Sequence, residues 1–339
     1  MGESEWSVEA KISSVVMKST LKPRLGLHED LAKRVVFIDG ITRCGKSMFT
    51  GIIPSLEGME HVQFYNILEH VIPAMSLGWL EDEFTRVFLR MNLNELCYNI
   101  QLSRGVNFRP DDQSGIPNYR NPQVYHDRLK RMEGEEIVTE LREGRQMTPF
   151  QTHDILVNLE HLDKLNIQYQ MLELFRHPID NAYSWWARGW GSRFGTDPRA
   201  FTLTLERDDR QLPWYCLGYE EKWLAMNPAE RSVYTSVDLI KRSVEQYLKA
   251  PNKSLIHILT FEDFCTQPAQ ELKRICDFLG TKTTSETPQY IAAARCPRIL
   301  NSDDRLRKLT ELNSKCSKEI IAELLRMSKS YETNLYGLQ

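Results

Sequence analysis

Residues 35–49 read VVFIDGITRCGKSMF, and the fold class follows from this stretch. Its first residues form a short apolar run, rich in β-branched side chains, that ends at Gly40, as a buried strand feeding a tight loop does. From Gly40 to Ser47 the chain matches G-x4-G-K-S, a pattern whose glycines let backbone N–H groups converge on a phosphate. The stretch therefore predicts a phosphate-binding loop between a strand and a helix.

Two further apolar runs predict strands of the same sheet. They read QYQMLELF, ending at Phe175, and SLIHILTF, ending at Phe261, and helical patterns separate all three runs. A parallel sheet flanked by helices is the simplest topology for this alternation. We predict a single α/β domain of the P-loop NTPase-like type over residues 34–339, preceded by a polar arm over residues 1–33.

The composition is that of an ordinary globular protein. The chain has 339 residues, 41% hydrophobic and 26% charged, which is ample for a sizeable core. The net charge of −3 argues against a nucleic-acid partner, because such proteins usually carry a basic excess. The seven cysteines are scattered without a C-x-x-C pair, which indicates neither a disulfide framework nor a metal site. No apolar run reaches the length of a signal peptide or a membrane span, so we expect a cytoplasmic protein with no membrane partner.

An ATP- or GTP-dependent enzyme would place further demands on the chain. Ser47 would hold Mg²⁺ with help from an acidic residue at the end of another buried strand. The best candidates are Glu262 and Asp263, which lie past the apolar run rather than at its end. An ATP-dependent kinase or NTPase stays open as the alternative, and a catalytically silent nucleotide-binding protein of the same fold is a third hypothesis.

Residues 172–186 read LELFRHPIDNAYSWW and carry a second set of phosphate ligands. Arg176, at the end of a strand, offers a forked set of donors, and Ser184 adds a hydroxyl in the helix that follows. The segment resembles the part of sulfotransferases that holds the 3′-phosphate of 3′-phosphoadenosine 5′-phosphosulfate (PAPS). The stretch FQTHDIL, with Thr152 and His153, resembles the Lys-Thr-His segment of that family, and LTFEDFCTQPAQELKRICDFLG resembles its C-terminal strand, turn and helix.

The resemblance implies a sulfotransferase-like domain that moves a sulfonate from PAPS to a hydroxyl or amine of a small-molecule acceptor. The donor would leave as 3′,5′-adenosine diphosphate, and no metal is expected, because cationic side chains and loop N–H groups can stabilise a sulfonate. The donor-binding residues that it implies are Thr42, Arg43, Cys44, Gly45, Lys46, Ser47, Met48, Arg176, Ser184, Arg295 and Arg298. Arg295 and Arg298 are the nearest substitutes for an Arg-Lys-Gly loop of the family. The late position of the lysine leaves open whether Arg43 or Lys46 contacts the sulfonate.

In-line transfer needs a base for the acceptor proton and a cation for the leaving oxygen, and the resemblance assigns the cation to Lys46. A neutral imidazole is suited to accept a proton near pH 7, which favours His153 as the base. Glu69 is the rival, because some membrane-associated relatives use a glutamate at a comparable interval after the loop. The sequence leaves the choice between His153 and Glu69 open.

Two long segments are expected on the acceptor side of the site. Residues 103–147 are rich in Gly, Pro, Asn and charge, and residues 187–235 carry tryptophans and turn residues. Long irregular segments in compact domains are usually functional lids or mobile surface. The polar character of residues 103–147 favours a polar acceptor, and a homodimer stays open.

Overall fold

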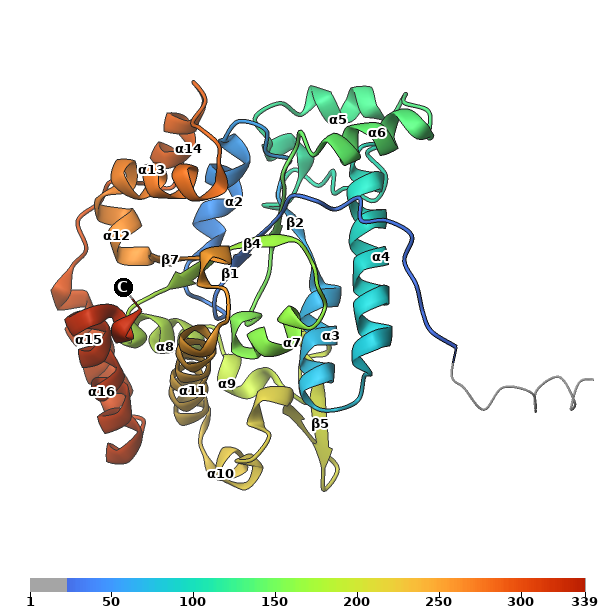
Figure 1. Ribbon diagram of the computed structural model, residues 1–339. Coiled ribbons are helices and arrows are strands. Elements are labelled where there is room, and N and C mark those ends of the chain that lie inside the picture. The colour runs from blue at the N-terminus through green and yellow to red at the C-terminus, as the bar shows by residue number, and fades with distance from the viewer. Residues whose placement is uncertain (1–22, 339) are drawn as a thin grey trace, which may run out of the picture.

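A five-stranded parallel sheet forms the centre of the computed structural model, which describes residues 23–338 (Figure 1). Its strand order is β2-β3-β1-β4-β7, and every neighbouring pair runs parallel. The strands are β1 (Val35–Asp39), β2 (Gln63–Phe64), β3 (Thr148–Gln151), β4 (Tyr169–Phe175) and β7 (Ile256–Thr260). The predicted α/β class is confirmed, and the three strands expected from apolar runs lie side by side as β1, β4 and β7.

Helices pack around the sheet in three groups (Figure 1). Beside β7 lie α2 (Phe49–Ile52), α12 (Phe261–Thr266), α13 (Pro268–Leu279) and α14 (Thr287–Ala293). A second group comprises α8 (Pro178–Ala187), α9 (Trp190–Arg193), α11 (Pro228–Lys249), α15 (Ser302–Asn313) and α16 (Lys318–Asn334). The third group comprises α3 (Asn66–Ser76), α4 (Asp82–Ile100) and α7 (Leu159–Asp163). A short helix, α10 (Glu220–Ala225), and a hairpin of β5 (Thr204–Arg207) and β6 (Arg210–Pro213) lie within the segment 187–235.

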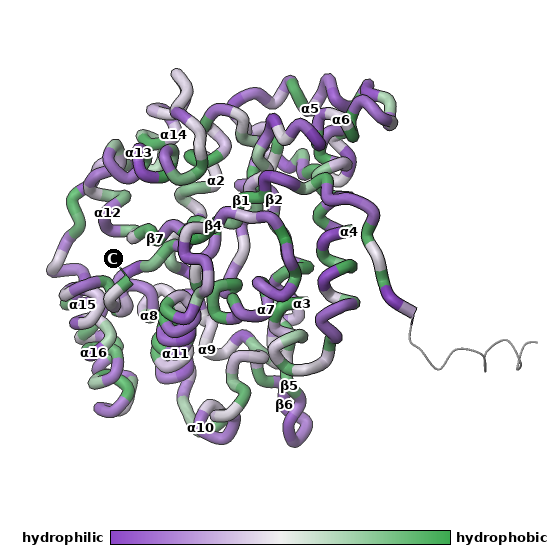
Figure 2. Tube along the Cα trace, viewed as in Figure 1, coloured by the Kyte–Doolittle hydropathy of each residue, from purple (hydrophilic) through white to green (hydrophobic). Residues whose placement is uncertain are grey.

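The strands form the core because most of their residues are apolar (Figure 2) and buried. All five residues of β1 are buried, and the ring of Phe37 lies against Phe150 of β3 and Tyr169 of β4. Strands buried on both faces are typical of parallel sheets covered by helices. The carboxyl ends of these strands therefore meet at one edge, where ligands of such sheets bind.

Helix α11 fixes the position of α8, which begins directly after β4. Asn227 caps α11 by accepting from the N–H groups of Ala229 and Glu230, and the Glu230 side chain accepts from the N–H of Asn227, which makes a full capping box. The buried face of α11 packs against α8 and α16. Ser184 on α8 is thereby held against a rigid neighbour.

The segment 103–147 lies at the amino ends of β2 and β3, where it carries α5 (Gln123–Arg128) and α6 (Glu135–Glu143) (Figure 1). Arg128 pairs with Glu60 just before β2, with Nη2 and Oε1 2.7 Å apart and both side chains buried. Burial by itself would raise the pKa of Glu60, but its bonds to Arg128 and Tyr125 hold that pKa below its ordinary value. This position differs from the acceptor-side position expected from the sequence, because polarity alone does not say which edge of a sheet a segment covers.

The described part of the N-terminal arm, residues 23–33, lies along α4. The side-chain oxygen of Asn94 accepts from the N–H groups of Leu31 and Ala32, and Arg90 pairs with Asp30. The predicted arm continues over residues 1–22, which lie outside the described residues. No helix between residues 23 and 338 combines the length and apolar character that crossing a membrane requires.

Candidate active site

The loop after β1 turns through three residues with left-handed backbones. Gly40, Arg43 and Gly45 have φ angles of 137°, 71° and 112°. A Cβ on Gly40 would lie 2.4 Å from the carbonyl oxygen of Leu174, so only glycine fits beside β4. Within residues 23–338 the N–H groups of Gly45 and Ser47 donate to no backbone or side-chain acceptor, and Ser47 is exposed. The loop therefore offers free donors to an anion, as the motif predicts.

Lys46 points away from the open side of this loop. Its ammonium is buried beneath the loop, where it donates to the carbonyl oxygens of Gly40 and, at 3.2 Å, Ile41. Its surroundings include the carboxyl groups of Asp39 and Glu173, which come from neighbouring strands. This position differs from the one expected from the sequence, in which Lys46 faces the leaving oxygen. Lys46 holds the loop in shape instead.

The cation on the open side is Arg43. Its Nε donates to Ser184 Oγ at 3.0 Å, and Nη1 of Arg176 donates to the carbonyl oxygen of Arg43 at 3.2 Å. Burial lowers the pKa of Arg43, and repulsion from Arg188 and Arg176 lowers it further. Three guanidinium groups thus lie close enough for Arg176 and Arg188 to repel Arg43, and within residues 23–338 no carboxylate pairs with Arg43, which favours a bound anion. Sequence reasoning missed Arg188. Its position one helical turn after Ser184 could have indicated that the two side chains lie on the same face of the helix.

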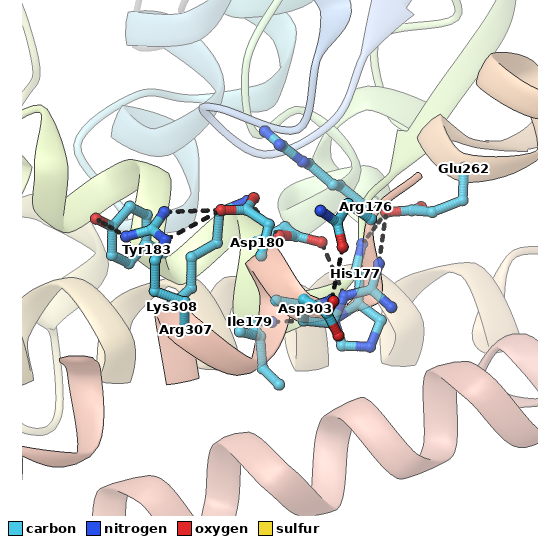
Figure 3. Close-up of polar contacts among 12 residues, drawn as sticks. Arg176, His177, Ile179, Asp180, Tyr183, Glu262, Asp303, Arg307 and Lys308 are labelled. Carbon is cyan, nitrogen blue, oxygen red and sulfur yellow. Dashed lines mark hydrogen bonds and ion pairs between the residues drawn. The ribbon is translucent and has the colours of Figure 1, made fainter. Parts of the chain in front are cut away.

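Helix α15 is joined to α8 directly beside this cluster (Figure 3). Asp180 accepts from Arg305 Nε at 3.0 Å and from Lys308 Nζ at 2.7 Å. Burial would raise the pKa of Asp180, but the bond and charge of Lys308, with Arg305, lower it below its ordinary value. Nδ1 of His177 accepts from the N–H of Ile179 and so caps α8. These contacts hold α8 in place, and Asp180 satisfies two cations of α15.

Two expected ligands of the donor, Arg176 and Arg298, lie around the ring of Phe261. The Cζ atoms of Arg176 and Arg298 lie 4.7 Å and 5.1 Å from the centroid of this ring, which also packs against Gly45. Arg298 is therefore brought to the cluster. Arg295 lies two residues after the end of α14 and has a left-handed φ of 56°, and within residues 23–338 its side chain forms no hydrogen bond or ion pair with the cluster.

Two other loop residues are held by their surroundings rather than by the cluster. The thiol of Cys44 is fully buried, so it cannot face a ligand. The sulfur of Met48 lies 3.8 Å from that of Cys296. Cys44 and Met48 can therefore contribute to the site through their backbone and through packing.

His153 and Glu69, the two candidate bases, lie in contact. Nδ1 of His153 and Oε1 of Glu69 are 3.0 Å apart. Asp39, at the end of β1, fixes the loop that carries His153: one carboxylate oxygen accepts from the Thr152 hydroxyl at 2.9 Å, and the other accepts from the N–H of Ile155 at 2.9 Å. The two residues that the sequence left as rivals therefore form one pair. Sequence reasoning missed Asp39. Its position at the end of a strand, directly before the phosphate-binding loop, could have identified it as a site residue.

This pair lines a cavity of about 210 Å³, and Arg43, Arg176 and Arg188 are not among the residues that line it. Besides His153 and Glu69, the polar lining consists of Thr42, Asn66, His70, Asp154 and Thr202. The apolar lining consists of Trp185, Trp190, Phe194, Ala200, Phe201, Trp214 and Tyr215. Most of these rings come from the segment 187–235, and among the described residues none from 103–147 lines the cavity. In residues 23–338, no group of three or more His, Cys, Asp or Glu side chains is arranged to hold a metal ion.

Asp154 predicts a pH dependence of stability. Burial raises the pKa of Asp154 to about 6, although Lys46 and His153 lower it in part. Because this pKa lies above the ordinary value of 3.8, the protonated carboxyl stabilises the fold below that value, and the contribution is lost as the pH rises through about 6. We expect the unfolding temperature of the wild type to fall relative to Asp154→Asn between about pH 4 and 6 and then to level off. Scanning calorimetry across this range tests it, and a constant difference would contradict the assignment.

Comparisons with known proteins identify the family of the chain. The family model of the sulfotransferase domain matches residues 35–298. In a comparison with curated proteins, no sequence matches the chain.

Several solved structures are similar to the chain. The sulfotransferase domain from the curacin biosynthetic pathway has 13% identity and a TM-score of 0.42, over 86% of this chain and 99% of that one. The sulfotransferase domain of the Synechococcus PCC 7002 olefin synthase has 12% identity and a TM-score of 0.44, over 92% and 98%. Mouse sulfotransferase SULT7A1 complexed with PAP has 12% identity and a TM-score of 0.40, over 91% and 88%. At sequence identities and TM-scores this low, these similarities give no information about the chemistry of this chain.

The matched region runs from the first residue of β1 to Arg298, and so includes every expected site residue. It contains the phosphate-binding loop, the arginine cluster and the pair of His153 and Glu69. The chain belongs to the sulfotransferase family and is a sulfotransferase.

Proposed function

We propose that this sulfotransferase moves the sulfonate of PAPS to a hydroxyl or amine of a small-molecule acceptor, without a metal and with His153 as the general base. The observation that carries the proposal is that the site has two sides: Arg43, Arg176 and Arg188 lie close enough to repel one another on one side, and on the other His153 and Glu69 line a cavity that none of these arginines lines. An anionic donor fits the first side, and an acceptor fits the second.

The residues on the donor side fit PAPS. Free N–H groups of Gly45 and Ser47, with the Ser47 hydroxyl, would hold the 5′-phosphosulfate, and PAPS would supply the sulfonate there. Arg176 and Ser184 would hold the 3′-phosphate, and Arg298 adds a cation on the same side. Arg43, which lies between the loop and Ser184, replaces Lys46 as the cation that faces the sulfonate.

The pair of His153 and Glu69 fits a general base and the carboxylate that orients it. If Nδ1 of His153 carries the proton toward Glu69, Nε2 is left as an acceptor for the acceptor's proton. Glu69 then stabilises the imidazolium that forms, a role that a carboxylate takes beside many catalytic histidines. The lining of the cavity by both residues supports this assignment.

The kinase or NTPase alternative is not favoured by any contact of the loop. Such an enzyme needs its loop lysine on the β- and γ-phosphates. The Lys46 ammonium is instead bound to loop carbonyl oxygens beneath the loop. The Arg43 guanidinium, which faces outward toward Ser184, is the available cation.

Thermal-shift measurements test the donor assignment. At about 100 times its Kd, a ligand that binds only the folded state stabilises it by about 2.7 kcal/mol, which is a readily measured shift. We expect 3′,5′-adenosine diphosphate to shift the unfolding temperature without Mg²⁺, and ATP with Mg²⁺ to shift it far less. A larger shift with ATP and Mg²⁺ would favour a kinase, and stabilisation by 3′,5′-adenosine diphosphate without any transfer would favour a catalytically silent protein.

A further inference from the structure

The two halves of the site carry opposite charge. Arg43, Arg176 and Arg188 converge on the donor side, where they repel one another. The acceptor cavity is lined by the carboxyl groups of Glu69 and Asp154, and none of the described residues that line it is a lysine or arginine. The negative charge of an anionic acceptor would therefore be repelled by two carboxylates.

Aromatic rings make up most of the rest of the cavity wall. Trp185 lies 5.7 Å from Trp190 and 6.3 Å from Tyr215, and Phe194 lies 6.0 Å from Trp190 and 5.7 Å from Tyr215, between ring centroids. The faces of such rings attract cations, and cages built from them bind organic ammonium groups. Trp190 already shows this behaviour, because the guanidinium of Arg193 lies 4.8 Å from its centroid.

The two carboxylates of the cavity lack full counter-charge. Asp154 accepts from the N–H of Thr42 at 3.3 Å, and its nearest ammonium, Lys46, is shared with Asp39 and with loop carbonyl oxygens. Burial raises the pKa of Asp154 to about 6, which is the response of a carboxylate short of positive partners. Glu69 faces His153, which is neutral when it serves as a base. Aromatic faces and undercompensated carboxylates together suit one kind of ligand, a cation.

We propose that the acceptor is a small organic cation, a compound that carries an ammonium group and a separate hydroxyl that receives the sulfonate; this rests on the proposed function. The cavity of about 210 Å³ is smaller than the usual range for drug-sized ligands, so the acceptor is small. In the transfer, the hydroxyl oxygen of the acceptor forms a bond to sulfur while the bond from sulfur to the 5′-phosphate oxygen breaks. The acceptor's proton passes to His153 Nε2, and 3′,5′-adenosine diphosphate leaves.

Three phenols of similar size and different charge test the proposal by binding: tyramine, 4-propylphenol and 3-(4-hydroxyphenyl)propionate. Calorimetric titration and tryptophan fluorescence, both with 3′,5′-adenosine diphosphate present, give their dissociation constants without turnover. We expect tyramine to bind about tenfold more tightly than 4-propylphenol, because a desolvated contact between a cation and aromatic rings is worth ~1–2 kcal/mol. The propionate should bind most weakly. Equal affinity for all three, or tighter binding of the neutral or anionic phenol, would overturn the proposal.

The variant Asp154→Asn tests whether the preference for a cationic phenol arises in the cavity. Asparagine tolerates the left-handed backbone at this position, where φ is 60°, so the fold should be kept. We expect the advantage of tyramine over 4-propylphenol to shrink several-fold, while the affinity for 4-propylphenol stays within about twofold. Asp82→Asn is the matched control, because Asp82 is exposed and pairs with Lys164 at the start of α4. An unchanged charge preference in Asp154→Asn and in Glu69→Gln would overturn the proposal.

The outcomes separate this inference from the function on which it rests. A wild type that is stabilised by 3′,5′-adenosine diphosphate and sulfates 4-propylphenol as well as tyramine would keep the proposed function and overturn the cationic acceptor. A wild type that binds tyramine preferentially but gains no stability from 3′,5′-adenosine diphosphate would overturn the donor assignment instead.

Discussion

Arg176→Ala is expected to weaken the binding of 3′,5′-adenosine diphosphate by about 100-fold, because hydrogen bonds between a charged donor and phosphate contribute ~1.5–3 kcal/mol and this residue can make two. The binding of adenosine 5′-monophosphate, which lacks the 3′-phosphate, should weaken by less than about threefold. The difference follows from the place of Arg176 directly after β4, where it contacts the ring of Phe261 and the carbonyl oxygen of Arg43, whose side chain binds Ser184. Calorimetric titration of both nucleotides measures it.

Two further variants distinguish a specific loss of the 3′-phosphate contact from a general disturbance of the loop. Arg176→Lys keeps the charge but loses the fork of donors, so its affinity should fall between those of the wild type and Arg176→Ala. Arg274→Ala removes an exposed arginine on α13 and should change neither affinity. An equal loss for both nucleotides in Arg176→Ala would mean that Arg176 supports the loop rather than the 3′-phosphate.

His153→Ala should lower kcat by about 10²- to 10⁴-fold, the usual contribution of a general base, while the dissociation constant of 3′,5′-adenosine diphosphate stays near that of the wild type. The reason is position: His153 lines the acceptor cavity, whereas Arg43, Arg176 and Arg188 do not. Initial rates with PAPS, together with titration of the product nucleotide, separate the two effects. His161→Ala, on α7 and outside the cavity, is the matched control.

Glu69→Gln decides which member of the pair accepts the proton. With His153 as the base, the variant keeps partial activity, and the acidic limb of its pH–rate profile moves to lower pH, because the imidazolium loses a stabilising carboxylate. With Glu69 as the base, the variant would be as inactive as His153→Ala, and His153→Ala itself would keep substantial turnover.

The sheet and its loop could be predicted from the sequence because they are local patterns. A few consecutive residues are enough to identify the apolar runs of β1, β4 and β7, and the same is true of the glycines of the loop. The inward turn of Lys46 could not be predicted, since the carboxyl group of Glu173 beside it comes from a strand distant in the sequence. The pairing of His153 with Glu69 has the same origin, because it is made by the folded sheet edge.

The long segments show the limits of composition as a guide. We expected residues 103–147 and 187–235 both on the acceptor side, but the first packs on Glu60 at the amino ends of the strands, whereas the second supplies rings to the cavity. Composition could not separate them, because the strand ends to which each attaches are set by tertiary contacts. A cytoplasmic location, a homodimer and the absence of a nucleic-acid partner stay predictions.

Sulfonate transfer from PAPS can be measured without knowing the acceptor. Purified protein is supplied with PAPS and a polar metabolite extract in the presence of a chelator, and the products are analysed by mass spectrometry. We predict products heavier by one SO₃ group and an equal amount of 3′,5′-adenosine diphosphate, both lost in His153→Ala. Phosphorylated products from ATP and Mg²⁺, with no sulfated product from PAPS, would contradict the account.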